Sequence, residues 1–328
     1  LVEALKEQYE KYQNLEKKFK KLQKNFKKFQ KNFKMNIYIC SLISKKNIKF
    51  LNAHLKSLDS LKIPSNYKFG MVFIINPKIY IAKNLIKKLL NNIDYSILIS
   101  VKDNIPDSRN VFLKFIQNKE IQYAGFLDDD CSVDKDWLLN MVKFVNQNDC
   151  DIVGGPQKHK IKNNSYTDYY YCLEPRRTHG KTVKWIATNN CFFSKKIFSK
   201  SKVFFDNKFA RVGGSDQLFF SELNKKEFII KWNKKSFITE NFSQEREKKR
   251  WFFYRNLRYG YSGNMIDKKI YGKISIIIIL SKIIYLVSIS FLFIITLSRK
   301  NYIKAFFLLF RALGRFIGLF NFKPKKYI

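Results

Sequence analysis

The segment YAGFLDDD, residues 123–130, is the part of the sequence that most constrains the fold. A mostly apolar run of this length predicts a buried strand. Asp128, Asp129 and Asp130 follow it directly, and three adjacent carboxylates repel one another unless a cation or hydrogen-bond donors neutralise them. Carboxylate oxygens suit Mg²⁺ or Mn²⁺, which also bind diphosphate oxygens. The segment therefore predicts a metal site, with a solvated acidic turn as the alternative.

Apolar runs and helical periods alternate on both sides of this segment. We predict strands at residues 36–42, 71–75, 96–101, 123–127, 151–153 and 184–188. Helices are predicted at residues 48–60, 80–91, 108–118 and 134–146. This alternation predicts an α/β fold with a mostly parallel, doubly wound sheet. Ligands of such sheets bind beyond the carboxyl ends of the strands, where the aspartates fall.

The charge balance indicates an anionic partner. The chain has 328 residues, which is room for one large domain with appendages or for two small domains, and its formal net charge is +37. Nucleic acid, an anionic membrane surface and phosphorylated substrates are all compatible with that charge. Because the sequence is rich in Lys, Asn, Ile and Phe, a pattern that an AT-rich genome also produces, the charge alone is weak evidence.

The cysteines point to a reducing compartment rather than to a metal or disulfide framework. There are five, with no CxxC pair and only three histidines, so no zinc-ligand spacing can be assembled. We expect reduced, mostly buried thiols.

Residues 1–34 predict one long helix. Apolar residues recur every seven positions, at Leu5, Tyr12, Phe19, Phe26 and Phe33. A coiled coil that makes a homo-oligomer and an amphipathic helix on another surface both fit this pattern. Met35 follows at once, so the segment is also interpretable as an extension or a fusion.

The C-terminal part predicts membrane association. Residues 241–270 read as a basic helical segment and residues 271–328 as membrane-associated helices. The run at 274–297 contains one charge, Lys282, and is long enough to cross a hydrocarbon core of about 30 Å.

A second apolar run, residues 305–320, is interrupted by Arg311 and Arg315. A central arginine costs about 2.5–3.5 kcal/mol on insertion scales, so a full second span is not expected. The basic flanks should keep both ends on the cytoplasmic side. We therefore expect a shallow or re-entrant first helix and an interfacial second helix.

Two further motifs carry polar groups suited to binding. Arg109 and Asn110 follow the turn at residues 106–108 and open a predicted helix, a natural seat for phosphate, although a solvent-facing Arg is the alternative. At residues 213–216, GGSD precedes an apolar helical run. Ser215 is predicted to cap that helix. Asp216 would then serve as a general base or only complement the helix dipole.

Five motifs, taken in order, resemble glycosyltransferase family 2. They are SRN at 108–110, FLDDDCSVDKDWL at 126–138, VGGPQ at 153–157, ATNNCFFSKKIF at 187–198 and GGSDQLFF at 213–220. The nearest likeness is to the bacterial branch that adds sugars to exopolysaccharide or lipid-linked acceptors, and it runs from about residue 35 to the C-terminus.

The resemblance implies a GT-A catalytic domain at residues 35–240, a nucleotide-sugar donor, Mn²⁺ or Mg²⁺, and inversion at the anomeric carbon. Asp128 and Asp130 match the outer positions of the DxD motif, with Asp130 on the metal and Asp128 on the ribose or the metal's water shell. The residues implied in donor binding are Arg109, Asn110, Asp128 and Asp129.

The resemblance makes Asp216 the catalytic base. It places the acceptor beside Trp185, Asn189, Asn190, Gly213, Gly214 and Ser215. Ser215 departs from the family, which usually has Glu there. Glu247 stands before Arg250 and Trp251 where processive polymerases have Gln, which favours single addition.

These features together predict an inverting glycosyltransferase at the cytoplasmic face of the plasma membrane, acting on a glycan or lipid-linked acceptor. One alternative is a basic protein that binds nucleic acid or an anionic surface. However, the basic residues of 268–328 surround apolar runs, which fits a membrane better than nucleic acid. A nucleotidyltransferase using the same carboxylates is the other alternative, and it would release pyrophosphate.

Overall fold

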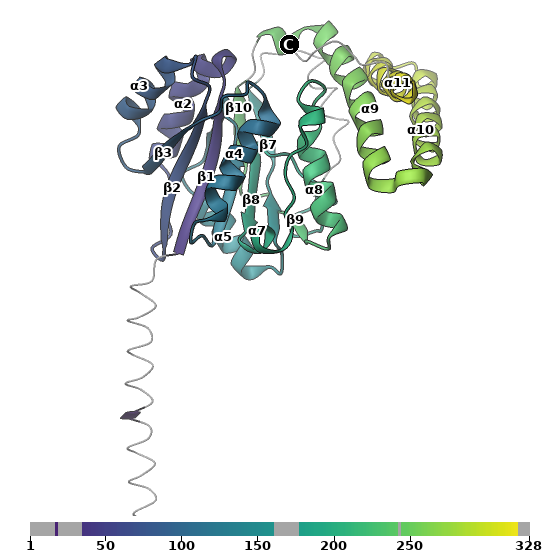
Figure 1. The fold of residues 1–328 in the computed structure, drawn as a ribbon. Coiled ribbons are helices and arrows are strands. Elements are labelled where there is room, and N and C mark those ends of the chain that lie inside the picture. The colour runs from purple at the N-terminus through teal and green to yellow at the C-terminus, as the bar shows by residue number, and fades with distance from the viewer. Residues whose placement is uncertain (1–16, 19–34, 161–176, 242–243, 321–328) are drawn as a thin grey trace, which may run out of the picture.

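The computed structural model describes residues 17–18, 35–160, 177–241 and 244–320. Its core is a seven-stranded sheet of order β3-β2-β1-β4-β8-β6-β9 with helices on both faces (Figure 1). Strand β8 is antiparallel to β4 and to β6, and the other neighbouring pairs are parallel. The predicted mostly parallel α/β fold is confirmed. Apart from Lys17 and Lys18, the helix predicted at residues 1–34 lies outside the described residues.

The main sheet and its covering helices alternate along the chain. The strands are β1 (Met35–Ile43), β2 (Tyr67–Ile75), β3 (Asp94–Ile99), β4 (Tyr123–Leu127), β6 (Ile152–Gly154), β8 (Asn190–Ser194) and β9 (Ile230–Trp232). The helices are α2 (Ile48–Asp59), α3 (Tyr80–Leu89), α4 (Ile105–Gln117), α5 (Trp137–Gln147), α7 (Lys196–Lys200) and α8 (Ser215–Lys225).

A second, three-stranded sheet has the order β5-β10-β7. Its strands are β5 (Cys131–Val133), β7 (Gln157–Lys160) and β10 (Ile238–Asn241). Strand β5 begins immediately after the three aspartates, so the residues of this second sheet lie next to them.

The core has one apolar layer on each face of the main sheet. Alternate residues of β4 belong to different layers: Tyr123 and Leu127 pack with α2, α3 and α5, whereas Ala124 and Phe126 pack with α4 and α8. Burial on both faces explains why the strand reads as a continuous apolar run.

The strand predicted at residues 184–188 is wrong, because the strand of this region is β8. Residues of β8 pair with β4 and with β6, so its apolar side chains fill both layers. Ile186 instead packs from a loop onto Gly154, where an added Cβ would come within 2.6 Å of Ile186 Cγ2. Two short apolar runs lie close together here, and periodicity cannot tell which one pairs with β4.

Helices α9 (Lys249–Tyr271), α10 (Ser275–Ile295) and α11 (Arg299–Leu319) form a bundle beside the α/β domain (Figure 1). Helices α9 and α11 approach so closely that a Cβ on Gly314 would lie 1.9 Å from the Leu257 carbonyl oxygen. A Cβ on Gly260 would lie 2.0 Å from the Arg311 carbonyl oxygen. Glycine at both positions therefore permits this packing.

The arginines of the second apolar run face α9. Arg311 donates to Asn256 Oδ1 at 2.8 Å, and Arg315 pairs with Asp267 at 2.8 Å. Lys282 of α10 pairs with the same Asp267 at 2.7 Å. Asp267 is 4% exposed, so it links all three helices from inside the bundle.

We predict that Asp267→Asn destabilises the bundle by about 3 kcal/mol, because two cations then lose the buried carboxylate that neutralises them. Urea unfolding followed by circular dichroism measures the change. Asp103→Asn, at an exposed position, is the matched control and should change stability by less than about 0.5 kcal/mol. Equal effects of the two substitutions would contradict the role of Asp267.

Candidate active site

The aspartates lie at the carboxyl edge of the main sheet. They follow β4, whose neighbour β1 is parallel and ends at the same edge. Because β8 is antiparallel to β4, its first residue, Asn190, lies opposite Leu127. The ends of β1 and β4 and the start of β8 therefore meet around the carboxylates, as the fold class predicts.

Asp129 points inward and holds the end of β1. The Ser44 backbone N–H donates to Oδ2 of Asp129 at 2.7 Å, and Asn47 Nδ2 donates to Oδ1 at 2.6 Å. Burial raises the pKa of Asp129 to about 7, although these two donors act in the opposite direction. Both carboxylate oxygens are engaged, so the structure gives Asp129 a supporting position rather than the direct donor contact expected from the sequence.

Asp128 is the most exposed of the three aspartates, and Arg109 approaches it. Its side chain is 39% exposed, and Arg109 Nη2 lies 3.8 Å from Oδ1. Arg109 is buried, its guanidinium lies 5.3 Å from the Phe205 ring centre, and its Nε has no hydrogen-bond partner in the described part of the chain. A buried guanidinium with an unused donor beside a half-exposed carboxylate is suited to an anionic ligand.

Two expectations about α4 change. The helix begins at Ile105 with Asn104 as its cap, so Arg109 lies inside the helix and not at its N-terminus. The amide of Asn110 is fully used by the Phe205 backbone, donating to its carbonyl at 2.9 Å and accepting from its N–H at 2.8 Å. Asn110 therefore supports the ring beneath Arg109 rather than contacting a donor directly.

Asp130 belongs to an ion cluster that the sequence does not reveal. Arg246 Nη1 lies 3.3 Å from Asp130 Oδ2 and 2.6 Å from Glu240 Oε1. His159 Nδ1 lies 3.2 Å from the other oxygen of Glu240, and Gln157 donates to Glu240 as well. The pairing of β10 with β5 and β7 sets Glu240 opposite Cys131 and His159.

The two carboxylates of this cluster, Glu240 and Asp130, have pKa values shifted in opposite directions. Burial acts to raise the pKa of Glu240, but the His159 hydrogen bond and the Arg246 charge outweigh it and hold that pKa below the usual value. Burial and the negative charges of Glu240 and Asp128 raise the pKa of Asp130 well above its usual value, against the charge of Arg246. Glu240 lies in the segment FITEN, residues 237–241, and nothing in that segment marks it as part of the cluster.

Asp216 lies in the first turn of α8. Gly214, with φ +88°, caps this helix, so the predicted capping role of Ser215 is wrong. The conformation is left-handed, which glycine adopts without strain.

Burial raises the pKa of Asp128, and the positive charge of Arg109 lowers it. The negative charges of Glu240 and Asp216 raise it further. Asp216 therefore acts on Asp128 electrostatically, and the two predicted site carboxylates belong to one region.

The residues predicted on the acceptor side have different surroundings. Asn190 is buried and fully bonded, accepting from Trp137 Nε1 at 3.0 Å and donating to the Ser236 carbonyl at 2.8 Å, so its role is structural. Asn189 is half-buried and donates to Gln157 at 2.6 Å. Trp185 stacks on the Arg177 guanidinium at 5.0 Å. Asn189 and Trp185 remain suited to contact an acceptor.

The carboxylates fit a divalent cation shared with a ligand. Burial and mutual repulsion raise the pKa of both Asp128 and Asp130, so a further positive charge between them would be stabilising. Among the described residues, no three His, Cys, Asp or Glu side chains converge to hold a metal by themselves. One or two carboxylates completed by phosphate oxygens and water is the arrangement that Mg²⁺ favours.

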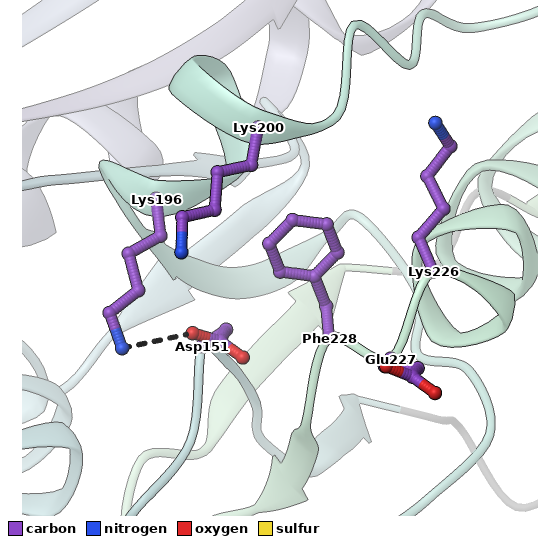
Figure 2. Close-up of a pocket in the computed structure, with 6 residues that line it drawn as sticks. All are labelled: Asp151, Lys196, Lys200, Lys226, Glu227 and Phe228. Carbon is purple, nitrogen blue, oxygen red and sulfur yellow. Dashed lines mark ion pairs between the residues drawn. The ribbon is translucent and has the colours of Figure 1, made fainter.

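A hollow of about 350 Å³ lies at the opposite edge of the sheet (Figure 2). Lys196, Lys200 and Lys226 surround Phe228 there, and Lys196 pairs with Asp151 at 3.6 Å. Asp151 precedes β6 and Phe228 precedes β9, which places the hollow at the amino ends of these strands. It is separate from the carboxylate site.

The comparison with protein families decides the class of the catalytic domain. Residues 57–204 match the family described as Glycosyl transferase family 2. The chain carries a family 2 glycosyltransferase domain. The activity class is therefore glycosyl transfer, which is favoured over the nucleic-acid-binding and nucleotidyltransferase alternatives. Arg109 and the three aspartates lie within the matched segment, whereas Asp216 lies beyond it.

Solved structures of S. aureus TarS 1-349 share the fold. The complex with UDP has a TM-score of 0.50 at 12% identity, covering 88% of this chain and 92% of that chain. The complex with UDP-GlcNAc has a TM-score of 0.50 at 11% identity and the same coverage. At such identity the likeness shows the GT-A fold alone. No curated protein matches the chain.

We predict that Arg246→Gln destabilises the catalytic domain by about 2 kcal/mol, because Asp130 and Glu240 then lack their shared cation. Adding Glu240→Gln should recover part of the loss, with a coupling of about 1–3 kcal/mol in a double-mutant cycle by urea unfolding. Arg250→Gln, at an exposed position, is the control and should be near neutral. Strict additivity would show that Arg246 and Glu240 do not interact.

Proposed function

We propose that the protein is an inverting glycosyltransferase that moves one sugar from a nucleotide-sugar donor to a hydroxyl of a glycan or lipid-linked acceptor. The observation that carries the proposal is that two carboxylates come near enough for their charges to interact: the half-exposed Asp128, inside the segment matched to family 2, and Asp216, in the first turn of α8. The TarS structures with UDP and UDP-GlcNAc support the donor class.

The donor side is formed by Arg109 and Asp128. The guanidinium of Arg109, whose Nη2 approaches Asp128, offers a positive charge to the diphosphate. Asp128 would contact the ribose or the water shell of the metal. Asp129 and Asn110 support these groups through their bonds to Ser44, Asn47 and Phe205.

Asp216 is the proposed base. It lies in the first turn of α8, beside the positive end of the helix dipole. Asp216 takes the proton of the acceptor hydroxyl, whose oxygen attacks the anomeric carbon from the face opposite the nucleotide. The new carbon–oxygen bond forms as the bond to the diphosphate breaks, and the nucleoside diphosphate leaves with the electron pair.

We assign Mn²⁺ or Mg²⁺ to Asp130 and Asp128. When bound, the ion would stabilise the negative charge that develops on the leaving diphosphate. Arg246 holds Asp130 from the opposite side and keeps Glu240 neutralised.

We place the acceptor beside Trp185, Asn189 and the Gly213–Ser215 turn, and the enzyme at the cytoplasmic face of an anionic plasma membrane. Within the described residues, one helical stretch, Lys249–Ile295, meets the length and apolarity expected of a membrane span, and α10 is its apolar part. Only 17% of its most apolar window is buried, unlike the core helix of a soluble domain. This supports membrane association.

We predict that Asp216→Asn lowers the transfer rate about 10²–10⁴-fold with little change in donor affinity, because only proton transfer is lost. Purified protein incubated with a panel of nucleotide sugars and Mn²⁺ or Mg²⁺ provides the assay, with nucleoside diphosphate release as the readout. Asp149→Asn, at an exposed position near the other edge, is the control. Equal losses of rate and binding would assign Asp216 a structural role, and release of pyrophosphate would overturn the proposed function.

We predict that Asp130→Asn abolishes donor hydrolysis and weakens Mn²⁺-dependent donor binding, since one metal ligand loses its charge. Hydrolysis with and without EDTA, and donor titration by calorimetry, measure both effects. Near-parental activity of the variant, together with no effect of EDTA on the parent, would show that the metal assignment is wrong.

A further inference from the structure

Helix α10 has one exposed face and one buried face. Ile277, Leu280, Ile284, Val287, Phe291 and Ile295 recur every three or four residues, so they lie on one side of the helix, and each is at least 45% exposed. Ile279, Leu286 and Ser290 lie on the other side and are buried. A stripe of large apolar side chains along a whole helix marks an interaction surface.

This stripe faces away from the catalytic domain. Helix α9 contacts α8, and α10 lies on the far side of α9 (Figure 1). Helix α11 packs along both α9 and α10. Nothing in the described part of the chain covers the outer side of α10.

Length alone would allow α10 to span a bilayer. Its 21 residues extend about 31 Å, close to the thickness of the hydrocarbon core. The bundle contradicts a span, because α10 is tied to Asp267 through Lys282 and lies along α11. Crossing the bilayer would take α9 into hydrocarbon as well, and α9 carries Arg255, Arg258 and Lys268.

Charge distinguishes a lipid surface from a second copy of the chain. Lys273 lies before α10 and Arg299 after it, and both are exposed. No Asp or Glu occurs after Asp267 in the sequence. Two copies joined along α10 would bring cations together at both ends of the stripe, whereas an anionic bilayer would neutralise them.

We propose that α10 docks the enzyme onto anionic lipid by lying in the plane of the membrane, with the Ile277–Ile295 stripe in the acyl region and Lys273 and Arg299 at the headgroups. The buried Asp267 cluster holds α10 in this orientation. The inference deepens the proposed function by specifying how the active site is kept at a membrane. It rests on that function only for the reason that the enzyme would need to be at a membrane.

The first test is flotation of the full chain with vesicles of phosphatidylglycerol and phosphatidylcholine, compared with phosphatidylcholine alone. We expect binding to the anionic vesicles that weakens with salt. The double variant Ile284→Glu/Phe291→Glu should lower the bound fraction at least about tenfold. Ile81→Glu, 63% exposed on α3 at the other end of the main sheet, is the matched control and should bind as the parent does.

The second test measures depth. Single cysteines at Ile277, Ile284 and Phe291, in a background with Cys150 and Cys172 replaced by Ser, are labelled with a fluorophore and quenched by nitroxide lipids. Docking in the plane predicts equal, shallow depths at the three positions. A deep Ile284 label with shallow labels on either side would show a spanning helix and overturn the proposal.

Two further outcomes would decide whether α10 docks onto lipid. Parental vesicle binding by the double variant would overturn docking through α10. A lipid-free dimer that this variant abolishes, with no vesicle binding by the parent, would assign the stripe to a second copy. Donor hydrolysis needs no membrane, so vesicle binding without hydrolysis would leave docking intact while the proposed function failed.

Discussion

Three consecutive carboxylates at the end of a buried strand impose the main electrostatic constraint on this protein. Charged groups removed from water must be neutralised or they destabilise the fold. Each aspartate meets this requirement differently. Asp129 accepts from the end of β1, Asp128 has Arg109 beside it, and Asp130 shares Arg246 with Glu240. The elements around the site are arranged so that each aspartate has such a partner.

The partners come from segments far apart in the sequence. Glu240 and His159 reach the site on the strands of the second sheet, and Arg246 follows β10 on a short helical turn at Gln244–Glu247. The His159 hydrogen bond and the Arg246 charge hold the pKa of Glu240 low, while those of Asp128 and Asp130 stay raised. Asp128 and Asp130, the carboxylates that we propose hold the metal, are thus left short of positive charge. An added cation between them would be stabilising.

The C-terminal bundle also contains a buried carboxylate that neighbouring cations neutralise. Asp267 is buried and neutralised by Lys282 and Arg315, one from each of the other two helices. Glycines at the α9–α11 contact bring the backbones close, so the arginines of α11 have partners inside the bundle. Polar groups are therefore used internally, and the outward side of α10 remains almost wholly apolar.

Much of the fold and part of the site were determined by local sequence. Continuous apolar runs predicted β1 and β4 closely, because a strand buried on both faces needs apolar side chains at successive positions. The order of the motifs predicted the family and placed Asp128, Asp130, Arg109 and Asp216 in one region, since strand ends converge at one edge of a parallel sheet.

Only the tertiary structure decided which polar groups face the ligand and which support the frame. Asn110, Asp129 and Asn190 looked like binding residues, yet their hydrogen bonds go to the chain itself. Glu240, His159 and Arg246 went unnoticed, and the partners of Arg311 and Arg315 on α9 were not predicted. A side chain's partners depend on residues tens of positions away, and a sequence read locally carries no information about which of them will be in contact.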